Sequence, residues 1–304
     1  MTRLTVMTPS YAPDFDSFVR LHRSVQRFTN ADVQHIAIVP SADRDLFASI
    51  DDSRLQVVDY RELLPRSVVQ TGWIAHAAAR VPRLPRGARI AAINLRRPWP
   101  PLRGWVIQQL AKLAAASAVE DGVIVFLDSD AELIRPIDAS TFSRTDGTVR
   151  FYRKPDAVTD ETSRHMGWHR VARELIGTQP LPGPRPDFIA GLVTWNPAIV
   201  RACLAEIENV TGRRWVEAVG GRRDFSEYQL YGEFLDEFGT SAQTAFTSDD
   251  PLCHSHWEPR PMTQLEARAF VDSIRPDDVA IHVQSNSDTS ADVIRYVRTA
   301  LALA

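Results

Sequence analysis

Short apolar runs and helical apolar periods alternate along the first part of the chain. Apolar runs at 4–8, 35–39 and 55–60 predict strands, and residues 15–28 repeat apolar positions with the period of a helix. Five consecutive apolar residues at 123–127 predict a strand that is buried on both faces. Strands that alternate with helices are typical of a parallel sheet with right-handed crossovers. We therefore expect an α/β fold with a mostly parallel central sheet flanked by helices.

The second half of the chain continues with strands and helices, interrupted by a proline-rich loop at 180–186. The patterns predict strands at 148–152, 188–195 and 279–285, and helices at 168–175, 198–210, from 224 onward and at 291–303. Gly191 lies within one predicted strand, where a glycine marks either a bulge or the close approach of a ligand to the backbone.

Residues 80–103 break the alternation, because they hold seven arginines and five prolines. We expect an insertion loop here. Either it is a solvated basic loop, or it is a lid that brings positive charge to an anionic ligand.

The helical pattern from 102 to 119 has an unusual polar face, formed by Trp105, Gln108, Gln109 and Lys112. Lys112 is one of only two lysines in a chain that otherwise uses arginine. This face either points toward a binding site or is an ordinary solvent-exposed face that happens to contain glutamines.

The strand at 123–127 ends in Asp128-Ser129-Asp130. Residues two apart in an extended chain project to the same side, so both carboxylates can face one cation. Ligands of parallel α/β sheets collect at the carboxyl ends of the strands. The alternative is a solvated strand end, because Asp and Ser are also common turn residues.

Composition excludes several classes of protein. The 304 residues are 44% hydrophobic and 24% charged, with a net charge of −3, so we expect a globular protein with no global attraction to nucleic acid. Two cysteines are too few for a disulfide framework or a thiolate zinc site. We expect a cytoplasmic location, because the first residues lack the pattern of a signal peptide, and no transmembrane segment, although peripheral membrane contact stays open.

Two segments add a more specific pattern. They are Gly-Trp-x-x-Gln-Gln-x-x-Lys-Leu at 104–113 and Ser-Glu-Tyr-x-Leu-Tyr-Gly at 226–232. With the strand order and the Asp128-Ser129-Asp130 turn, the chain resembles the GT-A fold glycosyltransferases, and among them a poorly characterised bacterial group. The resemblance implies a single Rossmann-like GT-A domain over 1–304, with a nucleotide-sugar half at 1–136 and an acceptor-binding half at 137–304.

The resemblance further implies a nucleoside-diphosphate sugar as donor, with uridine as the expected nucleoside, and a divalent cation, Mn²⁺ or Mg²⁺. Carboxylate oxygens beside phosphates suit these hard cations. The implied metal ligands are Asp130 and Asp128, followed by a late histidine, with His282 ranked before His254. The implied donor-binding residues are Thr8, Pro9, Ser10, Tyr11, Asp59, Gln109, Lys112, Asp128, Ser129, Asp130, Gly191, Gln284 and Ser285.

Transfer to a hydroxyl of a small molecule or glycan requires a base, and Glu227 or Asp224 is the candidate. Their spacing is also that of a helix capping box, which is a sufficient structural reason for both. Aromatic rings that stack on sugars suggest an acceptor site, although core packing explains them nearly as well. The candidates are Trp168, His169, Trp195 and Tyr228.

Two other functions are open at this point. A sugar-phosphate nucleotidyltransferase uses the same metal and carboxylate chemistry, but we would expect a glycine-rich loop ending in Arg and Lys, which residues 8–16 lack. A non-catalytic sugar-nucleotide-binding protein would keep the fold without turnover, and the intact Asp128 and Asp130 argue against it.

Overall fold

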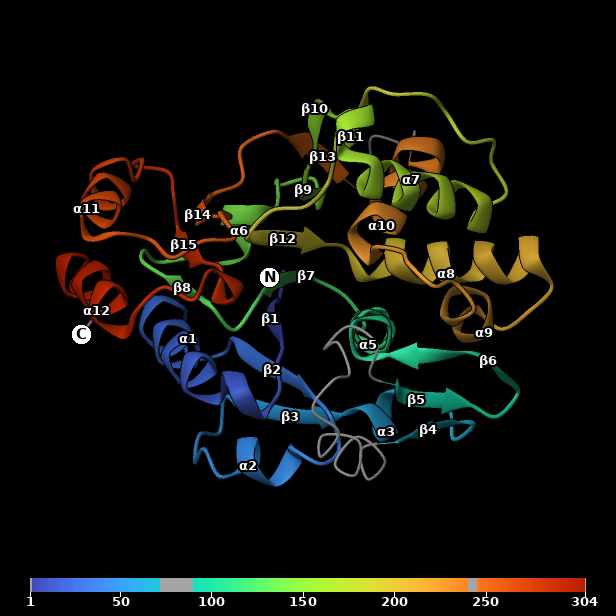
Figure 1. Cartoon of the computed structure of the whole chain (residues 1–304), viewed down its shortest axis with the longest axis horizontal. Coiled ribbons are helices and arrows are strands. Elements are labelled where there is room, and N and C mark those ends of the chain that lie inside the picture. Colours follow the sequence, from blue (N-terminus) through green and yellow to red (C-terminus); the bar gives the residue numbers. More distant parts are fainter. Residues whose placement is uncertain (1, 72–89, 240–244, 304) are drawn as a thin grey trace.

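A computed structural model describes residues 2–71, 90–239 and 245–303 of the protein, built around a five-stranded sheet (Figure 1). The strand order within the described residues is β12-β7-β1-β2-β3, with β7, β1, β2 and β3 parallel and β12 antiparallel to β7. The sheet confirms the expected α/β architecture. Its strands are β1 (Leu4–Pro9), β2 (Gln34–Val39), β3 (Leu55–Asp59), β7 (Val123–Leu127) and β12 (Leu192–Trp195).

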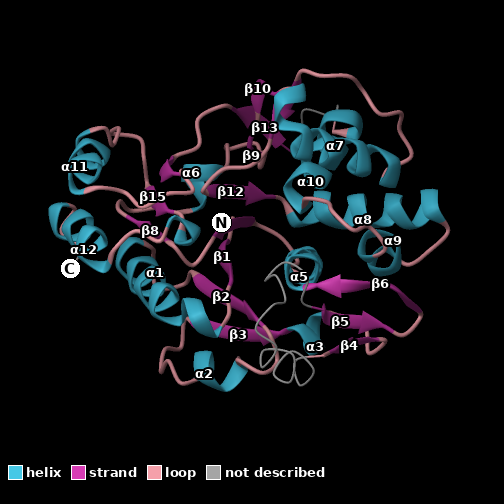
Figure 2. Ribbon diagram, in the orientation of Figure 1, coloured by secondary structure: helices cyan, strands magenta, loops and turns pink. Residues whose placement is uncertain are grey.

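Both faces of β7 are buried, because successive side chains of a strand point to opposite faces. Val123, Val125 and Leu127 pack in the cluster that includes helix α1 (Phe15–Phe28), while Ile124 and Phe126 pack in the cluster that includes α5 (Gly104–Ala118). The two helices lie on opposite sides of these strands (Figure 2). The continuous apolar run at 123–127 therefore reflects burial on both faces.

Three further long helices stand beside α5, at the β12 edge of the sheet. They are α7 (Ser163–Leu175), α8 (Pro197–Thr211) and α10 (Glu227–Phe238), and α10 packs against α5, α7 and α8. The other described helices are α2 (Arg44–Ala48), α3 (Tyr60–Leu63), α6 (Ala139–Phe142), α9 (Trp215–Gly220), α11 (Gln264–Asp272) and α12 (Ala291–Ala300), with short 3-10 helices η1 (Ala12–Asp14), η3 (Asp160–Thr162) and η4 (Ser285–Ser287).

A second sheet brings the late strand of the chain next to the Asp128–Asp130 turn. Its order is β14 (Cys253–His256), β15 (Ala280–Val283) and β8 (Ala131–Leu133). In the register of β15 and β8, His282 lies opposite Ala131, the residue after Asp130. Two smaller sheets have two strands each: β9 (Val149–Tyr152) with β13 (Ala245–Ser248), and β10 (Lys154–Val158) with β11 (Arg185–Asp187).

The expected insertion loop is wrong for residues 90–103. They form β5 (Ile90–Asn94) and β6 (Arg97–Arg103), which join β4 (Val68–Gln70) in an antiparallel sheet. β6 tolerates its three prolines because it is an edge strand and because its pairing with β5 is irregular between Arg97 and Leu102, where the prolines lie. Residues 80–89, the other part of that prediction, lie outside the described residues.

Two smaller expectations about the late segments also change. Ser226, and not Asp224, caps helix α10, since its hydroxyl accepts a hydrogen bond from the Gln229 amide. The strand predicted at 188–195 is shorter, because only Leu192–Trp195 pairs with β7. Among the described helices, none combines the length and the apolar character needed to cross a bilayer.

Candidate functional site

Two neighbouring cavities open at the carboxyl ends of the parallel strands. Cavity A has a volume of about 430 Å³ and cavity B of about 660 Å³, and Trp105 and Gln108 of α5 line both. Cavity A is otherwise lined by Ser10, Tyr11, Pro40, Ala42, Tyr60, Gln70, Ala91, Gly104 and Ile107. The main polar and aromatic residues of cavity B are Gln109, Lys112, Asp128, Arg164, His165, Trp168, Asp187, Glu227, Tyr228, Trp257, Gln284 and Asn286.

The Asp128–Asp130 turn lies beside both cavities. Asp128 lines cavity B, while the Ser129 hydroxyl donates to the Ser10 hydroxyl at 2.8 Å, next to cavity A. Asp130 accepts a hydrogen bond from the Ser285 amide at 2.7 Å, and its Oδ1 lies 3.2 Å from His282 Nε2. The turn, β15 and the residues after β15 therefore meet at one point.

The two carboxylates of the turn have different electrostatic surroundings. Burial opposes ionisation of Asp130, but its bonds with His282 and Ser285 lower its pKa below the ordinary value. Burial raises the pKa of Asp128, helped by the charge of Asp130 and opposed by Lys112. Burial also opposes charge on His282, yet Asp130 and Asp128 raise its pKa overall. The turn is a place where negative charge is concentrated.

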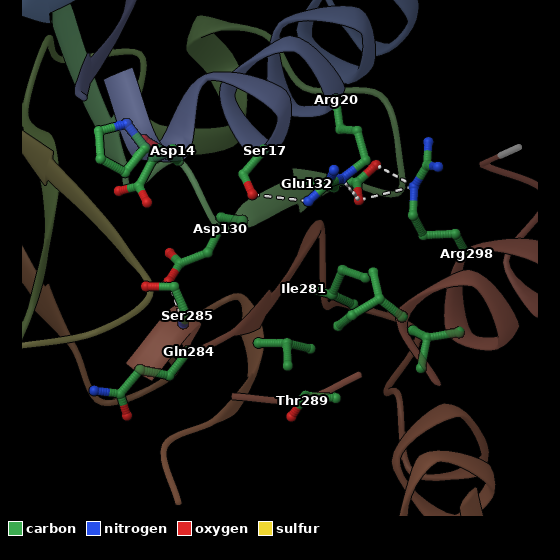
Figure 3. Close-up of a pocket in the computed structure, with 16 residues that line it drawn as sticks. Asp14, Ser17, Arg20, Asp130, Glu132, Ile281, Gln284, Ser285, Thr289 and Arg298 are labelled. Atoms are coloured by element: carbon green, nitrogen blue, oxygen red, sulfur yellow. Dashed lines mark hydrogen bonds and ion pairs between the residues drawn. The ribbon is translucent and has the colours of Figure 1, made fainter. Parts of the chain in front are cut away.

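Asp14 adds a third carboxylate near the turn. It lines cavity C, of about 280 Å³, together with Asp130, whose carboxylate points toward Ser285 (Figure 3). Partial burial, and then the charges of Asp130 and Asp128, raise the pKa of Asp14 to about 6. Glu132, deeper in cavity C, is held by Arg298 at 3.0 Å.

The two sequence segments singled out above meet at the wall of cavity B. Lys112 Nζ lies 2.5 Å from Glu227 Oε1 and 2.7 Å from the Tyr228 hydroxyl. The Glu227 amide donates to Gln109 Oε1 at 3.0 Å. Lys112 is only 4% exposed and Glu227 is also 4% exposed, so this is a buried ion pair with hydrogen-bonded partners. It fixes the start of α10 against α5.

Helix α7 supplies the opposite wall of cavity B. Arg164 lies over the rings of Trp105 and Trp168, 4.9 Å from each centroid, and its guanidinium donates two hydrogen bonds to Asp224 at 3.2 Å. The Trp168 indole donates to the same carboxylate at 2.9 Å. His165 stacks on Trp168 with ring centroids 4.6 Å apart. Asp224 therefore lies behind this wall and holds the side chains of Arg164 and Trp168 in place.

The antiparallel direction of β12 explains the last part of cavity B. Leu192 at the start of β12 pairs with Leu127 at the end of β7, so the residues before β12 lie beside the Asp128–Asp130 turn. Asp187, Ile189 and Ala190 of this segment line the cavity. The sequence did not predict that these three residues line a cavity.

Most of the predicted donor residues lie at one of the three cavities. Thr8 and Asp59 do not line them. Thr8 is buried and its hydroxyl hydrogen-bonds His35 Nε2 at 2.9 Å. Asp59 caps helix α3 by accepting from the amides of Arg61 and Glu62. The predicted donor residues at a cavity are Pro9, Ser10, Tyr11, Gln109, Lys112, Asp128, Ser129, Asp130, Gln284 and Ser285.

Gly191 has a packing role in place of the expected approach by a ligand. A Cβ at this position would lie 2.6 Å from Ser255 Oγ and 2.8 Å from Cys253 Sγ. The absence of a side chain lets the segment before β12 pass directly over β14.

Three other residues, predicted to bind the acceptor or the metal, form packing contacts away from the cavities. His169 is 2% exposed and bonds Glu233 at 2.6 Å, and Trp195 is fully buried and stacks on Tyr231. Ser255 pairs with His282 in the sheet, so the neighbouring His254 points to the opposite face from His282. On that face His254 contacts Ser273 and Phe270. Of the acceptor and metal predictions, Trp168 and Tyr228 line cavity B, and His282 lies beside Asp130.

Sequence reasoning missed several cavity residues, which include Tyr60 and Gln70 of cavity A and five residues of cavities B and C. The sequence predicted a helix that begins at 168, but α7 begins at Ser163, so the prediction did not include Arg164 and His165. Asp187 follows a proline-rich segment without a recognisable pattern. The last two were Asp14, which follows the first strand and its loop, and Trp257, whose ring lies 4.4 Å from that of His282.

Asp130 and His282 are the residues that could hold a divalent cation at the turn. Asp130 Oδ1 is buried and faces His282 Nε2 at 3.2 Å, and the other carboxylate oxygen accepts from the Ser285 amide. The described residues contain no group of three His, Cys, Asp or Glu side chains arranged as metal ligands. Mg²⁺ is commonly held by one or two carboxylates together with substrate phosphates, so a complete protein cage is not required.

Comparisons with known proteins give distant structural likenesses and one family. The galactosyltransferase LgtC in complex with donor and acceptor sugar analogs is 12% identical with a TM-score of 0.47, over 98% of this chain and 95% of LgtC. An active-site mutant of LgtC is 13% identical with the same TM-score and the same coverage. Likenesses this remote do not bear on function, and no curated protein matches the chain. A family model matches residues 4–295, so the chain belongs to DUF6492, a family of unknown function.

Proposed function

We propose that this protein is a metal-dependent glycosyltransferase that transfers a sugar from a nucleoside-diphosphate sugar, with uridine as the nucleoside, to a hydroxyl of a small molecule or glycan. The observation that carries the proposal is the position of the Asp128–Asp130 turn. It lies beside two neighbouring cavities at the carboxyl ends of parallel strands, where α/β proteins bind nucleotides.

Cavity A suits the nucleoside. Tyr11, Tyr60 and Trp105 offer aromatic surfaces to a base, and the side-chain amide of Gln108 offers a donor and an acceptor. Both ends of the Gln70 amide bond Ser41, which fixes Gln70 in the wall of the cavity. Ser10 lines this cavity and connects it to Ser129 through their hydroxyls. A nucleoside in cavity A would direct its diphosphate toward the turn and its sugar toward cavity B.

Asp130 and His282 are the residues that would hold the cation, with Asp128 beside them. When bound, Mn²⁺ or Mg²⁺ would neutralise charge on the departing diphosphate. The chain itself positions the cavity walls. Lys112 holds Glu227 in an ion pair at cavity B, where a carboxylate can take the proton of an acceptor hydroxyl. Asp224 is already bound to Arg164 and Trp168, so Glu227 is the better candidate of the two for the base.

Calorimetric titration of uridine diphosphate tests the proposal. We expect binding in the presence of Mn²⁺ that weakens at least tenfold without the metal. Asp130→Asn, which keeps the side-chain size, should remove the metal dependence. Asp272→Asn, an exposed change on α11, is the matched control and should behave as the wild type.

Two results would count against the proposal. One is an affinity for uridine diphosphate that is the same with and without Mn²⁺. The other is no binding of uridine diphosphate by a folded protein under either condition. Release of uridine diphosphate from its sugar conjugates, compared between wild type and Glu227→Gln, then tests the role of Glu227.

A further inference from the structure

Three carboxylates line cavity B, and they differ in what already binds them. Glu227 is paired with Lys112, and Asp128 belongs to the turn with Asp130. Asp187 Oδ1 accepts from the Ile189 amide at 3.1 Å and from the Gln229 side-chain amide at 3.4 Å. Within residues 2–71, 90–239 and 245–303, no Lys, Arg or His side chain lies within ion-pair distance of Asp187. Asp187 is therefore a fixed carboxylate with bonding capacity left for a ligand.

The two cations of cavity B are already neutralised. Lys112 is bound to Glu227, and Arg164 is bound to Asp224 between two indole rings. Burial lowers the pKa of His165, so its ring is neutral at pH 7. The lining thus carries three carboxylates against two paired cations, and an anionic ligand would meet a surface of its own sign.

Aromatic rings form the remaining walls. Trp105 is 38% exposed and Trp257 is 47% exposed, and the stacked His165 and Trp168 rings lie on α7. One face of a sugar ring consists largely of C–H bonds that pack on aromatic rings, while its hydroxyls donate hydrogen bonds to carboxylates. A volume of about 660 Å³ is within the range of cavities that bind small molecules.

We propose that cavity B binds a neutral sugar as the acceptor, with a hydroxyl of that sugar donating a hydrogen bond to Asp187. The inference rests on the proposed function only in calling this sugar the acceptor. Binding of the sugar itself does not require a donor. Asp187 and the neutralised cations determine the specificity, because they favour hydroxyl groups and disfavour carboxylate or phosphate groups at this position.

The test is a saturation-transfer NMR titration with matched sugars. Methyl glucoside and methyl galactoside should bind, and methyl glucuronide, which differs from the glucoside by a carboxylate, should bind at least tenfold more weakly. Asp187→Asn keeps the side-chain volume and the bond from the Ile189 amide, and should weaken the neutral glycosides about tenfold, as expected for loss of a hydrogen bond to a charged group. Asp272→Asn should leave them unchanged.

Calorimetry with uridine diphosphate and Mg²⁺ on the same samples separates the two proposals. Unchanged nucleotide binding by Asp187→Asn supports a role confined to the sugar. Glycoside binding that depends on Asp187 supports the inference even if the nucleotide does not bind. The inference is overturned if the glucuronide binds as tightly as the glucoside, if Asp187→Asn has no effect, or if the neutral glycosides do not bind. The comparison of glucoside with glucuronide uses only the wild type, so it stands even if the variant does not fold.

Discussion

Replacing Glu233 by glutamine should strongly destabilise the protein. Glu233 is fully buried on α10, where its oxygens accept hydrogen bonds from His169 at 2.6 Å and from Arg173 and Arg185 at 2.8 Å each. Glu233→Gln preserves the shape but removes the charge that these partners share. Arg185 would then lose its carboxylate partner, and Arg173 would keep only Glu237, which is a costly arrangement for buried charges.

The structure gives the size of the effect in two ways. Burial opposes the charge of Glu233, but the hydrogen bonds with His169, Arg185 and Arg173 lower its pKa from 4.5 to about 2. A shift of ~2.5 units corresponds to about 3 kcal/mol of stabilisation at neutral pH. Breaking one partner of a buried ion pair costs ~3–5 kcal/mol in other proteins. With an unfolding entropy of roughly 2.1 cal/mol/K per residue, 3 kcal/mol lowers the melting temperature of this chain by about 5 °C.

Thermal unfolding followed by circular dichroism measures this difference. Glu174→Gln is the matched control, because Glu174 belongs to a half-exposed pair with Arg222 on the same helix-packing region and should cost under about 1 kcal/mol. Because the pKa of Glu233 is lowered on folding, its contribution is complete above pH 4.5 and declines as the pH falls toward 2. A Glu233→Gln protein that melts within 1 °C of the control at pH 7 would refute the reasoning.

Three further changes have definite expected outcomes. Gly232→Ala should destabilise the protein by several degrees in the same assay, because its Cβ would lie 2.3 Å from the Phe188 ring. Lys112→Met should lower the melting temperature by a similar amount, since it leaves Glu227 buried without its cation, and Lys112→Arg is the control that keeps the charge. Burial lowers the pKa values of His35 and His22, so the stability of the folded protein should decline as the pH falls below 6.5. His35→Gln should reduce this decline in pH-dependent melting curves.

The sequence predicted the parallel part of the fold because hydrophobic burial repeats along the chain with a recognisable period. The runs at 4–8, 35–39, 55–60 and 123–127 correspond to β1, β2, β3 and β7. Residues 90–103 escaped prediction because their prolines and arginines have no period that identifies an edge strand. Strand pairing of that kind depends on neighbours far away in the chain, which local patterns do not contain.

The same distinction applies to the site. Asp128 and Asp130 were found because a buried strand leads directly into them, and Lys112 because it was an unusual residue on a helix face. The pairing of Lys112 with Glu227 joins residues 115 positions apart, and only the three-dimensional structure brings them together. His169 and Trp195 looked like binding residues, but buried hydrogen bonds and ring packing use the same residue types as sugar binding.

The shared wall formed by Trp105 and Gln108 has a consequence for the design of inhibitors. Because two side chains of one helix separate cavities A and B, a short connection past them would join a ligand of one cavity to a ligand of the other. The second group of such a molecule would bind as an intramolecular event, at a high effective concentration. Linking gains of roughly 10²- to 10⁴-fold over either half are attainable when the geometry allows both to bind at once. The positions of Trp105 and Gln108 on helix α5 would determine the length of the linker.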